Sequence, residues 1–235
     1  SIIILLIIFF IFKKFSQPSN IRVGTRSGKK NTLALIGLEG SGKTTLFYQL
    51  LDEKFVNTLT SMKENEGTLE IDSKKIPIVD LPGNGRVRYL LNQFIPVIGA
   101  IVIVIDAVNF SKEYRQVAEV VYDLITNIEL IENEVPILIA CNKFDILTAV
   151  EADAAKKTIL KELDELRSTR AATPSASAGL SMSELDEIEE EFVLGVRGEL
   201  LTWQQVPLDV QFAEISAKRG GDDVLPVLSF IEQSL

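Results

Sequence analysis

Short runs of apolar, often β-branched residues alternate along the chain with longer stretches in which apolar residues recur every three or four positions. The first kind of run predicts a strand and the second a helix. The expected strands are Thr32–Ile36, Thr68–Ile71, Ile76–Asp80, Ala100–Ile105, Ile137–Ala140 and Val210–Ile215, and the expected helices are Thr44–Leu51, about Val87–Gln93, Lys112–Asn127, Ala152–Arg167 and Leu225–Gln233. This alternation predicts an α/β fold with a mostly parallel six-stranded sheet and helices on both faces.

The amino-terminal stretch has a different pattern, because Ile2–Phe12 is apolar without interruption. A membrane span needs about 20 residues. Since the chain begins at Ser1 and not at Met, we expect residues 1–12 to be the last part of a longer transmembrane helix. Lys13 and Lys14 follow at once, and the positive-inside rule then places the rest of the chain in the cytosol. A buried core helix is the alternative, and a signal peptide fits less well because no small-residue cleavage site follows.

Charge is distributed unevenly along the chain. The net charge is -9, yet residues 1–30 carry six basic side chains and no acidic one. Residues 13–30 therefore predict a basic cytosolic linker between the membrane and a domain at 31–235. The acidic domain argues against direct nucleic-acid binding. The absence of histidine excludes a histidine-based zinc site or catalytic triad. A Ser-, Thr- and Ala-rich stretch followed by an acidic one predicts a surface insertion at about residues 168–198.

One loop carries a strong chemical signal. It reads Gly-x-x-x-x-Gly-Lys-Thr between an expected strand and an expected helix, the context that a phosphate-binding loop requires. Its residues are Gly37, Leu38, Glu39, Gly40, Ser41, Gly42, Lys43 and Thr44, with Thr45 next in the helix. Backbone N–H groups and the helix N-terminus would hold a polyphosphate, Lys43 would reach its β- and γ-phosphates, and the Thr44 hydroxyl would bind Mg²⁺. The alternative is an ordinary glycine-rich turn.

A second motif, Asn142-Lys143-Phe144-Asp145, selects the base. It follows the strand Ile137–Ala140 and therefore lies at the carboxyl edge of the sheet, where ligands bind in such folds. The Asp145 carboxylate can accept two hydrogen bonds from guanine, a donor pair that adenine lacks. Asn142 and Lys143 would brace the base and the phosphate loop. Ser216, Ala217 and Lys218 follow the last strand, and the Ala217 backbone would contact the guanine edge.

Two further elements indicate a switch. Asp80-Leu81-Pro82-Gly83 has the Asp-x-x-Gly arrangement, in which Asp80 would hold Mg²⁺ through water and the Gly83 N–H would contact the γ-phosphate. Thr60 is the expected switch threonine and a further Mg²⁺ ligand, with Thr58 as the alternative. These elements occur in the order and spacing of a small GTPase, so we expect a Ras-like P-loop fold that binds GTP or GDP with Mg²⁺.

Two residues predict slow GTP hydrolysis to GDP and phosphate. Ras-type enzymes orient the attacking water with a glutamine after Asp-x-x-Gly, and this chain has Asn84 there, which is one methylene shorter. Glu39 adds a bulky negative side chain close to the expected γ-phosphate. The sequence is compatible both with a slow GTPase and with a binding module that holds GTP.

The chain resembles the beta subunit family of the signal recognition particle receptor. The resemblance rests on the apolar start, the run Gly37–Leu46, Thr58–Ser61, Asp80–Gly83, Ile139–Lys143, Leu166–Arg170 and the region from Val210 to Lys218. Ras, Rab and Arf proteins lack the Leu-Arg-x-x-Arg segment and the insertion after it. The family often has histidine where this chain has Asn84.

The resemblance implies a single-pass protein of the endoplasmic reticulum membrane with its GTPase domain in the cytosol. In the GTP state such a domain binds the amino-terminal domain of the receptor alpha subunit, and the heterodimer recruits ribosomes to the translocation channel. The partner surface would be formed by the switch stretches around Thr60 and Asp80–Arg88. An Arf- or Sar-like trafficking GTPase is the alternative, but Ile2–Phe12 has no polar face for the interfacial helix of those proteins. A P-loop ATPase or nucleotide kinase is disfavoured by Asp145.

Overall fold

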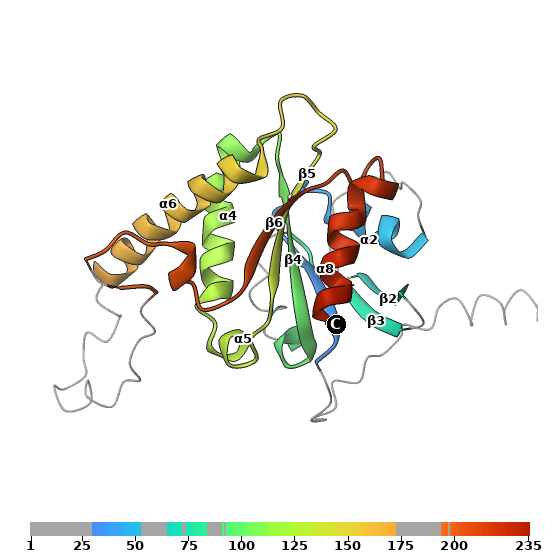
Figure 1. Ribbon diagram of the computed structural model, residues 1–235, viewed down its shortest axis with the longest axis horizontal. Helices are drawn as coiled ribbons and strands as arrows, with labels where there is room; N and C mark the ends of the chain where they lie inside the picture. The colour runs from blue at the N-terminus through green and yellow to red at the C-terminus, as the bar shows by residue number, and fades with distance from the viewer. Residues whose placement is uncertain are drawn as a thin grey trace, which may run out of the picture.

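A computed structural model describes residues 30–52, 65–71, 74–83, 91, 93–172, 194–196 and 198–235. Six strands form one sheet in the order β2-β3-β1-β4-β5-β6 (Figure 1). Only β2 runs antiparallel to its neighbour, and the other pairs are parallel. The strands are β1 Thr32–Ile36, β2 Asn65–Ile71, β3 Lys74–Asp80, β4 Ile98–Asp106, β5 Ile137–Asn142 and β6 Val210–Glu214. The sheet has the order and mostly parallel arrangement expected of a Ras-like fold.

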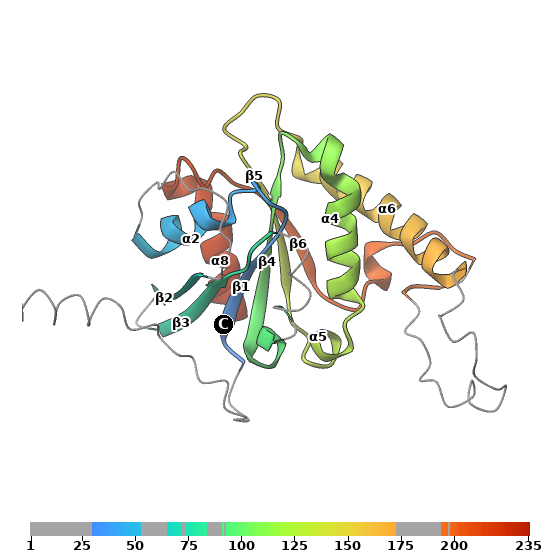
Figure 2. The ribbon, with the colours of Figure 1, turned by 180° about the vertical axis from the view of Figure 1, so that it is seen from behind.

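Helices cover both faces of the sheet (Figures 1 and 2). Their bounds are α2 Lys43–Asp52, α4 Phe110–Ile125, α5 Ile128–Glu132, α6 Ala152–Ala172 and α8 Leu225–Ser234, with short 3-10 turns η1 Ile95–Val97, η2 Trp203–Gln205 and η3 Gly221–Val224. Side chains of β4 alternate between two cores. Ile101 and Ile103 pack with α4 and α6, whereas Val102 packs with α2 and α8. A strand buried on both faces is apolar at every position, which is why this run stands out in the sequence.

The ends of the described domain lie opposite the carboxyl ends of the parallel strands. A Cβ on Gly99, at the start of β4, would come within 2.5 Å of the Lys30 carbonyl oxygen and 2.6 Å of Leu235 Cδ2. Lys30 also pairs with Glu129 of α5 at 3.7 Å. The chain therefore enters the domain beside its carboxyl terminus, which Figure 1 marks at the end of α8.

The helix predicted at Lys112–Asn127 is wrong at both ends. Helix α4 begins two residues earlier and ends at Ile125, and α5 follows as a separate helix. Asn127 explains the break, because its side-chain oxygen accepts a hydrogen bond from the Leu130 N–H at 3.1 Å and so caps α5. Strand β2 is three residues longer than predicted, since its polar first half pairs with β3 all the way to Asp80.

Several predictions concern residues outside the described part of the chain. They are the apolar run Ile2–Phe12, the linker up to residue 29, Thr58, Thr60, Asn84, most of the helix Val87–Gln93 and positions 173–193 and 197 of the insertion. Of that helix only Leu91 and Gln93 are described, and both are helical. Among the helices that are described, none has both the length and the apolar character needed to cross a membrane.

Helix α6 continues to Ala172, five residues beyond its predicted end at Arg167, so residues 168–172 of the predicted insertion belong to this helix. The Ser168 and Thr169 hydroxyls each donate to the carbonyl four residues earlier, at 2.9 Å, so these polar residues are compatible with a helix. Arg170 pairs with Asp123 at 3.1 Å and stacks 4.3 Å from the Tyr122 ring centroid. Contacts with α4 therefore extend the helix beyond the point that composition suggested.

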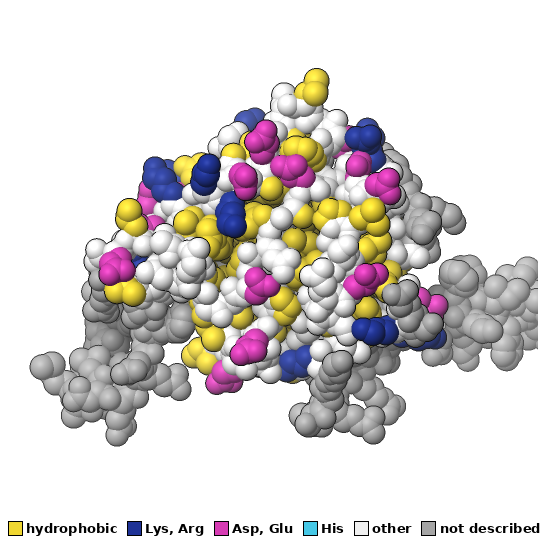
Figure 3. Space-filling model, viewed as in Figure 1, with side chains coloured by type: hydrophobic (Ala, Val, Ile, Leu, Met, Phe, Trp, Pro, Cys, Tyr) yellow, Lys and Arg dark blue, Asp and Glu magenta, His cyan; other side chains and the backbone are white. Residues whose placement is uncertain are grey.

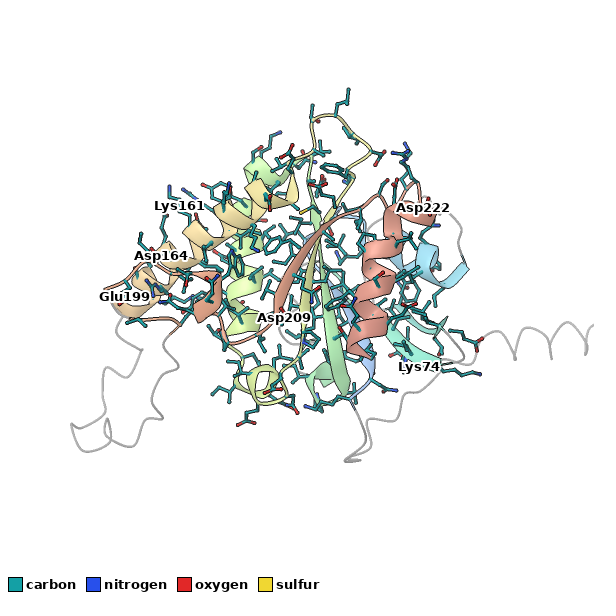
Figure 4. The ribbon with its side chains drawn as sticks, in the orientation of Figure 1. Lys74, Lys161, Asp164, Glu199, Asp209 and Asp222 are labelled. Atoms are coloured by element: carbon teal, nitrogen blue, oxygen red, sulfur yellow. The ribbon has the colours of Figure 1, made fainter. Side chains whose placement is uncertain are left out.

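Arg167 links helix α6 to the described residues that follow Leu194. Its guanidinium bonds to Asp164 (Nη2 at 2.6 Å, Nε at 2.8 Å) and donates to the carbonyl oxygens of Leu194, Val196 and Glu199. Asp164 also accepts the Leu201 N–H at 3.1 Å. Asp164 and Glu199 lie together near the end of α6 in Figure 4. The Leu-Arg-x-x-Arg segment is thus an anchor that joins the end of α6 to α4 and to the described residues between Leu194 and Leu201.

Replacing Arg167 by methionine should lower the free energy of unfolding by about 2 to 3 kcal/mol, because the partly buried acceptors on Asp164 and Leu194 lose their charged donor. For a domain of this size that corresponds to a fall in Tm of about 5 °C or more. Thermal unfolding followed by circular dichroism measures it. Arg115→Met is the matched control, since Arg115 is 72% exposed and reaches Glu162 only at 3.8 Å. Equal Tm values for the two variants would contradict the anchoring role.

Candidate functional site

The loop between β1 and α2 is closely packed and depends on glycine. Gly37 and Gly42 have φ angles of 146° and 96°, which side chains disfavour. A Cβ on Gly37 would lie 2.2 Å from the Val104 carbonyl oxygen, and one on Gly42 would lie 2.3 Å from Asn142 Nδ2. The loop residues 37–42 therefore lie against the end of β4 and against Asn142, directly before the N-terminus of α2. This gives a backbone cradle at a helix N-terminus, the arrangement that favours phosphate groups.

The side chain of Lys43, the first residue of α2, reaches back to this loop. Its side chain is buried, and Nζ donates to the Leu38 carbonyl oxygen at 2.7 Å. Burial lowers the pKa of Lys43, while the nearby carboxylates of Asp80 and Glu39 act in the opposite direction. The ammonium is thus held under the loop by a backbone carbonyl and two negative charges, close to where a phosphate would lie.

Asp80 ends β3 beside the first residues of α2. Its Oδ2 accepts hydrogen bonds from Thr44 Oγ1 at 2.7 Å and from Asn65 Nδ2 at 2.9 Å. Its Oδ1 is also buried, and no described residue donates to it. Burial raises the pKa of Asp80, although the bonds from Thr44 and Asn65 and the charge of Lys43 oppose the rise. A buried carboxylate oxygen without a donor, next to a hydroxyl, fits the oxygen ligands that Mg²⁺ prefers.

Gly83 brings the Asp-x-x-Gly segment against the loop. A Cβ there would come within 2.4 Å of the Glu39 backbone nitrogen. The segment that begins with Asp80 therefore touches the first turn of α2 through Thr44 and the loop through Glu39. The predicted switch threonine, Thr60, and the residue at the water-orienting position, Asn84, lie outside the described residues.

Asn142 joins three segments that are far apart in the sequence. Its Nδ2 donates to the Ser41 carbonyl at 2.8 Å, and its Oδ1 accepts the Ala217 N–H at 2.9 Å. Asp145 follows three residues later, and its Oδ1 accepts the Ser216 hydroxyl at 2.8 Å. The loop after β5 is thus bonded both to the phosphate-type loop and to the loop after β6. Lys218 is exposed beside them.

Lys143 is held by Asp106, a residue that the sequence analysis did not select. Lys143 has a positive φ of 69°, and its Nζ lies 2.6 Å from Asp106 Oδ2. Asp106 ends β4 and is only 4% exposed. It also accepts hydrogen bonds from the Val108 and Asn109 N–H groups at 3.0 and 3.2 Å and from Asn109 Nδ2 at 2.8 Å. Its position after a buried strand is the signal that could have identified it.

Asp106→Asn should lower the free energy of unfolding by about 2 kcal/mol at pH 7, because the change removes the charge that pairs with Lys143. Burial raises the pKa of Asp106, but the bonds from Lys143 and Asn109 outweigh it and keep the pKa below its usual range. The stabilisation is therefore present above the unfolded-state pKa and is lost as the pH falls through the folded-state pKa. Urea titrations between pH 7 and pH 3 measure the free energy of unfolding of both proteins. The difference between Asp106→Asn and the unsubstituted protein should become smaller as the pH falls. Asp153→Asn, at an exposed carboxylate of α6, should have the same free energy of unfolding as the unsubstituted protein at each pH.

All these groups lie at one end of the sheet. In Figure 4, Asp222 follows the loop after β6 at this end, whereas Asp209 and Lys74 mark the opposite end, where β6 and β3 begin. The described members are the loop 37–42 with Lys43, Thr44 and Thr45, then Asp80, Gly83, Asn142, Lys143, Asp145 and Ser216–Lys218, with Asn65 and Asp106 as additions. On the face in Figure 3, basic side chains are scattered among acidic ones and form no continuous basic surface.

Comparison with known proteins shows the family to which the chain belongs. The family model described as "Signal recognition particle receptor beta subunit" matches residues 28–210. Signal recognition particle receptor subunit beta of Dictyostelium discoideum is 32% identical over 223 residues, which cover 91% of this chain and 75% of that protein. The structure of the mammalian SRP receptor has 30% identity and a TM-score of 0.74, and the match covers 87% of this chain and 100% of the other. A structure of the SRb-GTP/SRX complex from Chaetomium thermophilum matches with 17% identity and a TM-score of 0.65, over 87% of this chain and 100% of the other.

Proposed function

Because this chain belongs to the signal recognition particle receptor beta subunit family, we propose that its site binds GTP and GDP with Mg²⁺ and acts as a switch. The observation that carries the proposal is Asn142, whose side chain bonds to the phosphate-type loop and to Ala217 at once. A nucleotide needs its phosphate-binding and base-binding groups at a fixed separation. Because Asn142 bonds to both the phosphate-type loop and the loop after β6, it holds these two loops at a fixed distance from each other.

Each part of the site has a role in this proposal. The loop 37–42 and Lys43 hold the phosphates, and Thr44 and Asp80 hold Mg²⁺, which neutralises phosphate charge when bound. Asp145 accepts the two guanine donors, the Ala217 N–H meets the guanine edge, and the stem of Lys143, fixed by Asp106, lies beside the base. Thr60 and Gly83 are proposed contacts of the γ-phosphate.

Turnover is proposed to be slow without a partner. Glu39 lies close enough to Lys43 to affect the pKa of its ammonium, so its negative charge is near the proposed phosphate site. The water-orienting position after Asp-x-x-Gly holds Asn84 instead of a longer glutamine. A GTP-bound state that persists suits a protein whose task is to hold a partner.

The proposed partner is the receptor alpha subunit, through its amino-terminal domain. The protein would anchor that subunit to the endoplasmic reticulum membrane through residues 1–12, with the domain in the cytosol, and so bring ribosomes to the translocation channel. The geometry supports this arrangement, because the chain enters the domain at Lys30, at the end opposite the site. A membrane tether at that end leaves the nucleotide site accessible.

Two binding measurements test the proposal. Competition of GTP, GDP and ATP for a fluorescent GDP analogue should show a strong preference for guanine nucleotides, and a preference for ATP would refute it. Capture of the alpha subunit by protein loaded with GTP or GDP should succeed only with GTP. Equal capture in both states would indicate a constitutive anchor and would refute the switch.

A further inference from the structure

Asn65 occupies the first position of the β2–β3 ladder, directly opposite Asp80. Its backbone is therefore held in register with the backbone of Asp80. Its side-chain Nδ2 also donates to Asp80 Oδ2 at 2.9 Å. Backbone pairing and a side-chain bond together fix the position of Asn65 relative to this one carboxylate.

The two oxygens of Asp80 have different surroundings. Oδ2 accepts from Thr44 Oγ1 at 2.7 Å and from Asn65 Nδ2, and these donors come from two different elements, α2 and β2. Oδ1 is buried, and within the described ranges nothing donates to it. With only the Thr44 bond, the carboxylate could rotate and present either oxygen. Two donors on Oδ2 fix the rotation and keep the Oδ1 lone pairs free.

We propose that Asn65 is a positioning residue for the Mg²⁺ of the proposed nucleotide site. It holds Asp80 so that Oδ1 stays free for the cation or for a water bound to the cation. An amide suits this role because it donates to the carboxylate without adding charge. An acidic side chain at this position would place a second negative charge beside Asp80. The inference rests on the proposed function, since it needs a divalent cation that accompanies a nucleotide.

Nucleotide release from the full chain, loaded with a fluorescent GDP analogue, tests the inference. In millimolar Mg²⁺, Asn65→Ala should release the nucleotide about tenfold faster or more than the unsubstituted protein, as expected for loss of one hydrogen bond to a charged group. The Mg²⁺ concentration for half-maximal retention should rise by a similar factor. With excess EDTA the two release rates should agree within about twofold, because Asn65 acts only through the cation.

Two variants serve as comparisons. Asn65→Gln keeps the amide but displaces it by one methylene, so it should show the same change in smaller degree and provides a result if Asn65→Ala does not fold. Thr68→Ala, at an exposed position of the same strand, should leave release unchanged.

The outcomes separate the inference from the proposed function. Release that is accelerated equally in Mg²⁺ and in EDTA would show that Asn65 only stabilises the fold, and unchanged release would show that the bond has no consequence. Either result overturns the inference while the GTP-binding proposal stands. Failure of the unsubstituted protein to retain the nucleotide in Mg²⁺ would overturn both.

Discussion

Asparagine in place of Asp145 should weaken GTP binding about 100-fold and give a protein that prefers xanthosine triphosphate. The Asp145 carboxylate can accept both the N1–H and the exocyclic amine of guanine, whereas an asparagine amide has one acceptor and turns a donor toward the other guanine donor. Losing about 3 kcal/mol of hydrogen bonding to a charged group gives the 100-fold factor. Xanthine carries an oxygen where guanine has the amine, so it can accept from the new amide.

The local structure allows this substitution. The Ser216 hydroxyl donates to Asp145 Oδ1 at 2.8 Å, and the oxygen of asparagine can accept the same bond. Competition of the two triphosphates for a fluorescent GDP analogue measures the preference. Asp222→Asn removes an exposed carboxylate at the same end of the sheet and should change neither affinity. A variant at Asp145 that still prefers GTP would show that this carboxylate does not contact the base.

The fold of the protein and the family to which it belongs could be predicted from the sequence, because both depend on local sequence patterns. The run Ile101–Ile105 is apolar at each position, as a strand covered on both faces must be. The phosphate-type loop, Asp80, Asn142 and Ser216 all follow expected strands, and parallel strands bring their carboxyl ends to one edge. The prediction of a Ras-like fold in the receptor beta subunit family is confirmed by the mammalian SRP receptor structure and the matching family model.

Residues whose role depends on register or on a distant partner could not be predicted in this way. Asn65 meets Asp80 only because β2 pairs with β3 from its first residue, and nothing in the polar run before Thr68 indicates that register. Asp106 is defined by its contact with Lys143, 37 positions away. Helix α6 outlasts its predicted end because Arg170 reaches Asp123 of α4. In each case a contact between residues far apart in the sequence determines the role of the residue or the length of the helix, and the local sequence does not show that contact.

Replacing Lys43 by methionine should have opposite effects on binding and on stability. The lost hydrogen bonds between the ammonium and the phosphates are worth about 4 kcal/mol. GTP binding should therefore weaken by about three orders of magnitude. The nucleotide-free protein should instead become about 1 kcal/mol more stable, since a buried ammonium is replaced by an apolar side chain of similar length. Asp80 and Glu39 lose a compensating charge, which keeps the gain small.

The pH dependence gives this prediction a second test. Burial lowers the pKa of Lys43 in the folded state, so between that pKa and the unfolded-state value near 10.5 the unfolded chain binds more protons. The stability contributed by this group therefore rises with pH across that interval, and the advantage of Lys43→Met should shrink there. Urea titrations of the nucleotide-free proteins at pH 7 and above measure this change. Lys112→Met, at an exposed lysine in the first turn of α4, should show neither effect. If Lys43→Met lowers both binding and stability, the buried ammonium is a structural support of the empty loop, and its charge is not reserved for the phosphates.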